Sequence, residues 1–236
     1  MPFPVDLTKP NASQVAVSEL AFFQKVYLWM CGGLVVSAFM TYALLHSESW
    51  LTFLFAQKST AIIVICAVQL GIVLGFGVLR NRVSATALKG LFLAYSASMG
   101  MTFSIVCLVY PSTVIFKAFI CAAAIYGGMA AYGLLTKKSL QAWGSFLFMA
   151  LLGLFVVSLV NMFTRSPMVD YVICFVGVLL FAGLTAYDHQ KLRVIHAGGF
   201  ANQDMEEKCV IQGSLELYLD FVNLFLFLVR ILGNRR

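Results

Sequence analysis

The sequence predicts an all-α membrane protein that crosses the lipid bilayer seven times. Hydrophobic residues make up 61% of the 236 positions and charged residues only 11%, with a mean hydropathy of +0.91. A soluble domain carries roughly 25% charged residues, so this composition excludes a soluble fold. Seven spans of about 20 residues occupy about 140 positions. The remainder suffices for short loops and for no separate soluble domain.

Seven apolar stretches, separated by prolines, basic pairs or short polar runs, define the predicted transmembrane helices. Pro111 ends the third stretch because proline breaks a helix, and the pair Lys137-Lys138 ends the fourth. Short connections predict that consecutive helices pack antiparallel. The stretches are residues 20–45, 59–79, 84–110, 112–135, 140–162, 168–187 and 213–232.

Two polar segments stand out beside these spans. Residues 1–19 form a polar tail without the basic start and short apolar core of a cleaved signal peptide. Residues 20–236 are expected to form one transmembrane domain, with its first span retained in the mature protein. Residues 190–212 mix charges of both signs and are expected to be the longest, most exposed loop.

The distribution of basic residues predicts a cytoplasmic N-terminus. In that orientation most of them lie in cytoplasmic loops, as the positive-inside rule requires, whereas the outside loops hold little beyond Lys58 and Arg165. The cytoplasmic set is Arg80, Arg82, Lys89, Lys137, Lys138, Lys191, Arg193 and Lys208. The C-terminal end disagrees, since seven spans place Arg230, Arg235 and Arg236 outside. A full seventh span is still preferred over partial insertion, because 20 residues are long enough to cross.

The charge and cysteine patterns predict no nucleic-acid site, metal site or cofactor. The net charge of +6 is scattered over loop ends, which suits anionic lipid headgroups better than nucleic acid. The six cysteines show neither CxxC nor Cys/His spacing. A nucleophile elbow, P-loop, HExxH motif and dinucleotide fingerprint are also absent from the sequence. The lipid bilayer is therefore the first expected partner.

The last apolar stretch carries the main functional signal, because two acids lie within a predicted span. Glu216 and Asp220 are four residues apart and Asn223 follows three residues later, so one helix face carries all three. An ionised group at the bilayer centre costs about 2.5–3.5 kcal/mol on insertion scales. This face is therefore expected to point toward the protein interior or toward water.

A further acid, Asp188, ends the sixth stretch in the run GLTAYDHQKLR. An isolated acid at that place is most simply a solvated helix end. Because the sixth and seventh spans are plausible neighbours, however, Asp188 and Asp220 are expected to meet. Two close carboxylates cannot both ionise cheaply, so the pair predicts a proton sensor, a cation ligand or both.

Two polar residues of the second stretch have open alternatives. Arg80, at its inner end, is either a positive-inside anchor or the counter-charge of a breakable latch with one of the acids. Gln69 either faces a lumen or donates a hydrogen bond to a neighbouring helix.

The run GLTAYDHQKLR, followed by GSLELYLDFVNLFLFLVRILGNRR, resembles the closing signature of the Bax inhibitor-1 family, particularly its bacterial inner-membrane branch. The polar tail, the seven-span pattern and the LFMALLGL and SLVNMF stretches also fit, so the resemblance covers nearly the whole chain. It implies six helices around a central seventh, a location in the cell inner membrane, and a pH-dependent calcium leak.

The resemblance also implies roles for particular residues. The aspartates of the YD and LYLDF motifs match Asp188 and Asp220 as a pH-sensing pair, and a second-span arginine that pairs with the sixth-span aspartate matches Arg80. Two positions depart from the family pattern. His189 replaces a small hydroxyl residue and would add a titration near about pH 6.5. Glu216 replaces an often uncharged residue and would supply a calcium oxygen or alter the proton affinity of the pair.

Calcium is accordingly the expected transported or bound ion, together with protons. It takes about 6 to 8 oxygen ligands, of which Asp188, Asp220 and Glu216 would provide only part. Such weak binding suits conduction. His189, Asn223 and Gln69 are expected modulators, and the predicted function is a pH-sensitive calcium or cation leak channel.

Three other functions share some of these features. Intramembrane aspartyl proteases also place YD on the sixth span and an aspartate on the seventh. They use GxGD and Pro-Ala-Leu motifs, however, whereas this chain has LYLD, so no enzyme is expected. A regulatory protein that controls a membrane-bound protease or a stress response would work through residues 1–19. An ion-coupled secondary transporter would show saturable, counter-ion-coupled flux.

Overall fold

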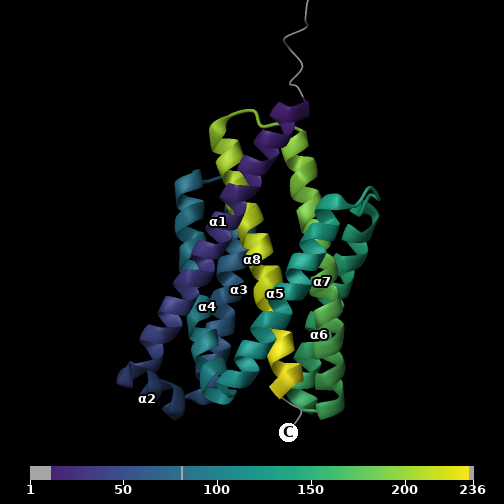
Figure 1. The fold of residues 1–236 in the computed structure, drawn as a ribbon. Coiled ribbons are helices and arrows are strands. Elements are labelled where there is room, and N and C mark those ends of the chain that lie inside the picture. Colours follow the sequence, from purple (N-terminus) through teal and green to yellow (C-terminus); the bar gives the residue numbers. More distant parts are fainter. Residues whose placement is uncertain (1–11, 81, 234–236) are drawn as a thin grey trace, which may run out of the picture.

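The computed structural model describes residues 12–80 and 82–233, which form eight α-helices (Figure 1). Seven are long and run along the bundle, whereas the short α2 lies at the end opposite the N-terminus (Figure 1). Within these residues no strand occurs. The helices are α1 Ala12–Leu45, α2 Glu48–Ala56, α3 Lys58–Leu79, α4 Ala85–Val109, α5 Ser112–Leu135, α6 Gln141–Thr164, α7 Pro167–Ala197 and α8 Gln203–Gly233.

Local sequence signals set the helix ends. Ser84 and Ser166 cap α4 and α7, each accepting a hydrogen bond from a backbone N–H three residues later. Pro111 separates α4 from α5, as the sequence predicts. Arg165 ends α6 in the left-handed conformation with φ 51°. These short connections produce the up-and-down order of helices seen in Figure 1.

Six helices, α1 and α3 to α7, are long and apolar enough to cross a membrane. The predicted all-α, polytopic membrane fold is therefore confirmed. The seventh long helix, α8, is not in that set and is the least apolar of the long helices. Its 31 residues nevertheless extend about 46 Å, more than the roughly 30 Å hydrocarbon core of a bilayer.

Helix α8 is sheltered by the other helices and occupies the middle of the bundle (Figure 1). It packs against α1, α4, α5 and α7, and its Leu217, Tyr218 and Leu224 are fully buried. Helices α3 and α6 pack on α4 and α7 and thus lie further from the centre. Protein surroundings, not lipid, therefore receive the polar side chains of α8.

The prediction of a loop at residues 190–212 is wrong, because most of this segment is helical. Helix α7 continues to Ala197 and α8 begins at Gln203, which leaves residues 198–202 as the connection. Ion pairs one turn apart support these polar helical ends, as between Lys208 Nζ and Asp204 Oδ2 at 2.8 Å. Gly199, with φ 75°, makes the turn.

Two further differences concern the first part of the chain. Residues 12–19 of the predicted tail are the first turns of α1, whereas residues 1–11 lie outside the described part. Helix α2 was not predicted. Ser47 caps it, and the indole of Trp50 donates a 3.1 Å hydrogen bond to Ser104 Oγ of α4, which holds α2 against the bundle.

Candidate functional site

The candidate site is a pair of buried aspartates between α7 and α8. Asp188 and Asp220 are 8% and 4% exposed, and their carboxyl groups lie close enough to interact directly. Two carboxyl groups buried side by side cannot both ionise cheaply, so this arrangement favours a proton shared between them. The second oxygen of Asp220, Oδ2, is buried without a hydrogen-bond partner among the described residues. The expected meeting of these two residues is thus present in the structure.

A lysine that sequence analysis treated only as a loop charge belongs to the same site. Lys191 Nζ lies 2.9 Å from Glu216 Oε1 and 3.6 Å from Asp188 Oδ1, so it links α7 with α8. Gln212 Nε2 also donates a 3.0 Å hydrogen bond to Glu216 Oε1. The spacing of Lys191, three residues after Asp188 on one helix, was the signal that could have revealed it.

The site carries an excess of acidic groups. One ammonium group, that of Lys191, faces the carboxyl groups of Asp188, Glu216 and Asp220. Glu216 Oε2, like Asp220 Oδ2, is buried without a hydrogen-bond partner among the described residues. Buried acceptors of this kind are costly and would accept a proton, water or a cation.

His189 is fully buried beside the acid pair and faces aromatic rings. Its ring stacks on Phe23 and packs near Tyr27 and Tyr126, with centroid distances of 6.4, 5.8 and 5.6 Å. Nδ1 donates a 2.6 Å hydrogen bond to the Thr185 carbonyl, while Nε2 has no partner among the described residues. His189 therefore belongs to the wall of the site, and among the described residues it makes no hydrogen bond to either aspartate.

The three acids do not form a metal centre in this arrangement. Across residues 12–80 and 82–233, no group of three His, Cys, Asp or Glu side chains is arranged to hold a metal ion. The ammonium of Lys191 lies against both Asp188 and Glu216, where a cation would otherwise bind. Any calcium contact therefore requires these groups to rearrange.

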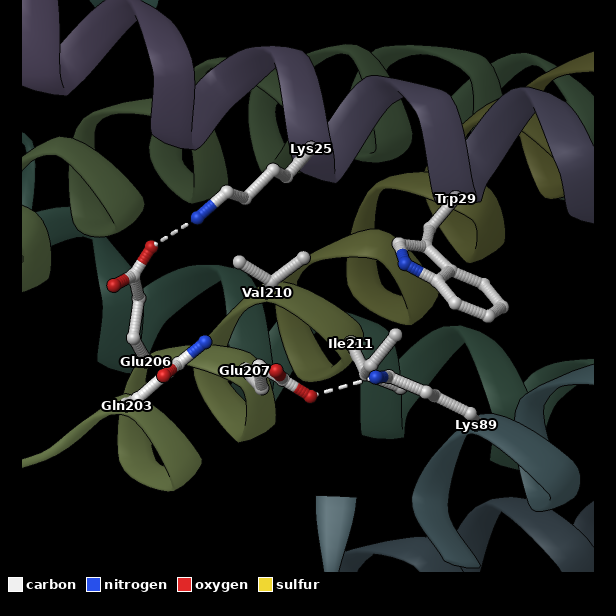
Figure 2. Close-up of a pocket in the computed structure, with 8 residues that line it drawn as sticks. All are labelled: Lys25, Trp29, Lys89, Gln203, Glu206, Glu207, Val210 and Ile211. Atoms are coloured by element: carbon white, nitrogen blue, oxygen red, sulfur yellow. Dashed lines mark hydrogen bonds and ion pairs between the residues drawn. The ribbon is translucent and has the colours of Figure 1, made fainter. Parts of the chain in front are cut away.

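A second group of charges fixes the first turns of α8 beside the site (Figure 2). Lys25 of α1 pairs with Glu206 at 2.7 Å, and Lys89 of α4 pairs with Glu207 at 2.6 Å. Lys89 Nζ also lies 5.9 Å from the centre of the Trp29 ring. This end of α8 is thus tied to two other helices, a few turns above the aspartates.

Comparison with known proteins identifies the family. A family model described as inhibitor of apoptosis-promoting Bax1 matches residues 19–236. The chain belongs to this Bax inhibitor-1 family. An Escherichia coli K12 relative, Inner membrane protein YbhL, is 39% identical over 217 residues, which cover 91% of this chain and 92% of that protein. An uncharacterised Borreliella burgdorferi protein is 35% identical over 232 residues, 98% of this chain and 99% of the relative.

The latch that the Bax inhibitor-1 resemblance implied is not formed by Arg80. That residue follows α3 and is exposed, and no ion pair joins it to Asp188 in the part of the chain that the structure describes. Asp188 instead has Lys191 beside it. A partner one turn away on the same helix needs no second helix to be brought close, which explains the difference.

The remaining predicted modulators form hydrogen bonds within the bundle. Gln69 Nε2 donates to the Ser98 carbonyl and to Thr102 Oγ1, at 3.1 and 2.8 Å, and so joins α3 to α4. Of the two alternatives for Gln69, the structure has the helix–helix bond. Asn223 Nδ2 donates to the Leu219 carbonyl of its own helix at 2.8 Å. Among the described residues, neither side chain is hydrogen-bonded to Asp188 or Asp220.

Proposed function

We propose that this member of the Bax inhibitor-1 family is a pH-sensitive cation leak channel of the inner membrane, with calcium as its main ion. The observation that carries the proposal is the neighbouring pair of Asp188 and Asp220, buried between the central α8 and α7. The inner-membrane location rests on the apolar helices and on the name of the Escherichia coli relative. A cytoplasmic N-terminus remains the orientation that the positive-inside rule favours.

The proposed gate is closed when the aspartates share a proton. A proton shared by the two carboxyl groups then holds α7 to α8, and Lys191 offsets the charge of Glu216. Loss of the proton leaves two like charges side by side in a site with little water, where repulsion is strong. The helices separate, water enters, and carboxylate oxygens become available to a passing cation.

The sign of the pH response follows from this arrangement. Because the compact state needs a proton, a rise in pH opens the gate and a fall in pH closes it. The excess of acids over bases at the site favours cations over anions in the open state. Incomplete coordination by protein oxygens keeps calcium binding weak enough for release.

The test is calcium flux into liposomes that contain the purified protein, between about pH 5 and 8. We expect the flux of the parent protein to rise with pH. Asp220→Asn keeps a hydrogen-bonding side chain that cannot ionise, so its flux is expected to stay low and nearly independent of pH. Asp188→Asn is expected to behave in the same way.

Glu48→Gln is the matched control, because Glu48 is an exposed acid on α2 at the other end of the bundle. It is expected to keep the parental pH profile. Flux no greater than that of empty liposomes, from folded parent protein at every pH, would disprove the channel. Saturable flux that requires a counter-ion gradient would instead identify a secondary transporter. Loss of partner control on deletion of residues 1–11, with flux intact, would reveal an added regulatory role.

A further inference from the structure

A large cavity lies far from the aspartates, at the end of the bundle that holds the α6–α7 turn. Its volume is about 1010 Å³. Helices α3 and α6 face each other across it, since α3 packs on α4 and α6 packs on α7. Exposed apolar side chains form its long wall, namely Ile62 and Cys66 of α3 and Phe155, Leu159 and Met162 of α6.

The end of this cavity, by contrast, is charged. Arg165, Asp170 and Arg230 line it together with Ser166. Arg230 pairs with Asp170 and so joins α8 to α7. The guanidinium of Arg165 makes no hydrogen bond or ion pair with any described residue, which leaves the group with one net positive charge.

The turn that presents Arg165 is fixed from beneath. Asn161 is buried, and its Oδ1 accepts hydrogen bonds of 3.1 Å from both the Ser166 backbone N–H and the Thr164 hydroxyl. Arg165 itself adopts a left-handed backbone conformation and is exposed. Its position at the mouth of the cavity is thus held by the fold, while its guanidinium is available to a ligand.

We propose that this cavity binds one phospholipid with an anionic headgroup. The apolar wall between two membrane-facing helices fits an acyl chain, and Arg165 and Arg230 fit a phosphate at the bilayer edge. Both arginines also lie on the side where the positive-inside rule disfavours basic residues, and a bound phosphate accounts for them. The net positive charge favours anionic over zwitterionic headgroups.

The apolar wall argues against a soluble anion as the ligand. A free phosphate would satisfy Arg165 and leave the surface of Phe155 and Leu159 uncovered, whereas a lipid covers both. Lipid binding at this place also bridges α3 and α6, which do not pack closely against each other.

The proposal is tested by native mass spectrometry of the protein purified in mild detergent and titrated with phosphatidylglycerol or phosphatidylcholine. We expect one phosphatidylglycerol to bind about tenfold more tightly than phosphatidylcholine, and Arg165→Gln to remove that preference. Arg82→Gln removes an exposed positive charge at the other end of the bundle and should change neither affinity.

Cys66→Trp provides a second variant that leaves the charges intact. The larger side chain narrows the cavity from an exposed position on α3, so it is expected to weaken the binding of both lipids while the protein remains folded. Equal phosphatidylglycerol affinity in the parent, Arg165→Gln and Cys66→Trp proteins would overturn the proposal. Binding of inorganic phosphate at this place without any binding of phosphatidylglycerol would overturn it as well, because the ligand would then be the anion.

Discussion

Lys191 and Glu216 form a 2.9 Å ion pair between α7 and α8, with the Asp188 carboxylate 3.6 Å from the same ammonium. This cation lies between two acids that sequence analysis assigned to calcium. It partly neutralises a site that would otherwise hold three acids within one crevice. The charge balance between Lys191 and the three acids is therefore the first property to test by substitution.

Removal of Lys191 alone is expected to destabilise the protein. Lys191→Met leaves Glu216 and Asp188 partly buried without their cation, at a cost of about 1–3 kcal/mol after allowance for partial exposure. The double variant Lys191→Met/Glu216→Gln should recover most of that loss. Thermal unfolding in detergent measures both, and a double variant as unstable as the single one would show that the pair does not stabilise the fold.

Exchange of Arg80 is expected to have no effect on gating. Because Arg80 is exposed and Asp188 has Lys191 beside it, Arg80→Gln should keep the parental pH profile of calcium flux. Lys191→Met, by contrast, should shift the rise in cation flux to higher pH, because without the nearby ammonium the aspartates hold their shared proton more tightly. A flattened profile in Arg80→Gln liposomes would restore the second-span latch that the family resemblance implied.

Close packing near the aspartates predicts a sensitive glycine. A methyl group on Gly133 of α5 would collide with the Ala186 backbone carbonyl, two residues before Asp188. Gly133→Ala should therefore destabilise the protein by about 1–3 kcal/mol by forcing α5 from α7. On the same helix Gly128 has open space around it, so Gly128→Ala is a control expected to be neutral or stabilising by up to about 1 kcal/mol.

A pH effect outside the membrane is expected at the start of α8. The side-chain hydrogen bond from Lys208 lowers the pKa of Asp204. A lowered folded-state pKa contributes stability above the unfolded pKa, and that contribution is lost as pH falls through the folded pKa. The difference in melting temperature between the parent and Asp204→Asn should thus be present at pH 7 and disappear in strong acid. A difference in melting temperature that persists in acid would show that hydrogen bonds of the protonated Asp204 side chain, and not its charge, cause the effect.

The pairing of Asp188 with Asp220 was predictable because the two acids lie on consecutive helices and neither belongs in lipid. The role of Lys191 was not, since a lysine beside a predicted span end looks like any positive-inside residue. The helical ends between Asp188 and Gln212 were missed for a related reason. Hydropathy identifies only the apolar part of a helix, whereas ion pairs such as Asp204–Lys208 extend it beyond the bilayer.

The central position of α8 also required more than composition. Hydropathy ranks α8 below the six apolar helices, because its acids count against it. Only three-dimensional packing shows that α1, α4, α5 and α7 enclose those acids. The sequence did not indicate that Arg230 pairs with Asp170, because the two residues lie 60 positions apart.

The short turn at residues 198–202 joins α7 and α8 at one end, so the two helices form a helical hairpin. Asp188 lies about 13 Å from the joint and Asp170 about 40 Å from it, by the rise of an α-helix. Any opening between the two helices that separates the aspartates would move their far ends further. The ion pair between Arg230 and Asp170 clamps those far ends. In the proposed channel, the site at Asp188 and Asp220 would therefore open by rotation or bending of α8 between two fixed ends.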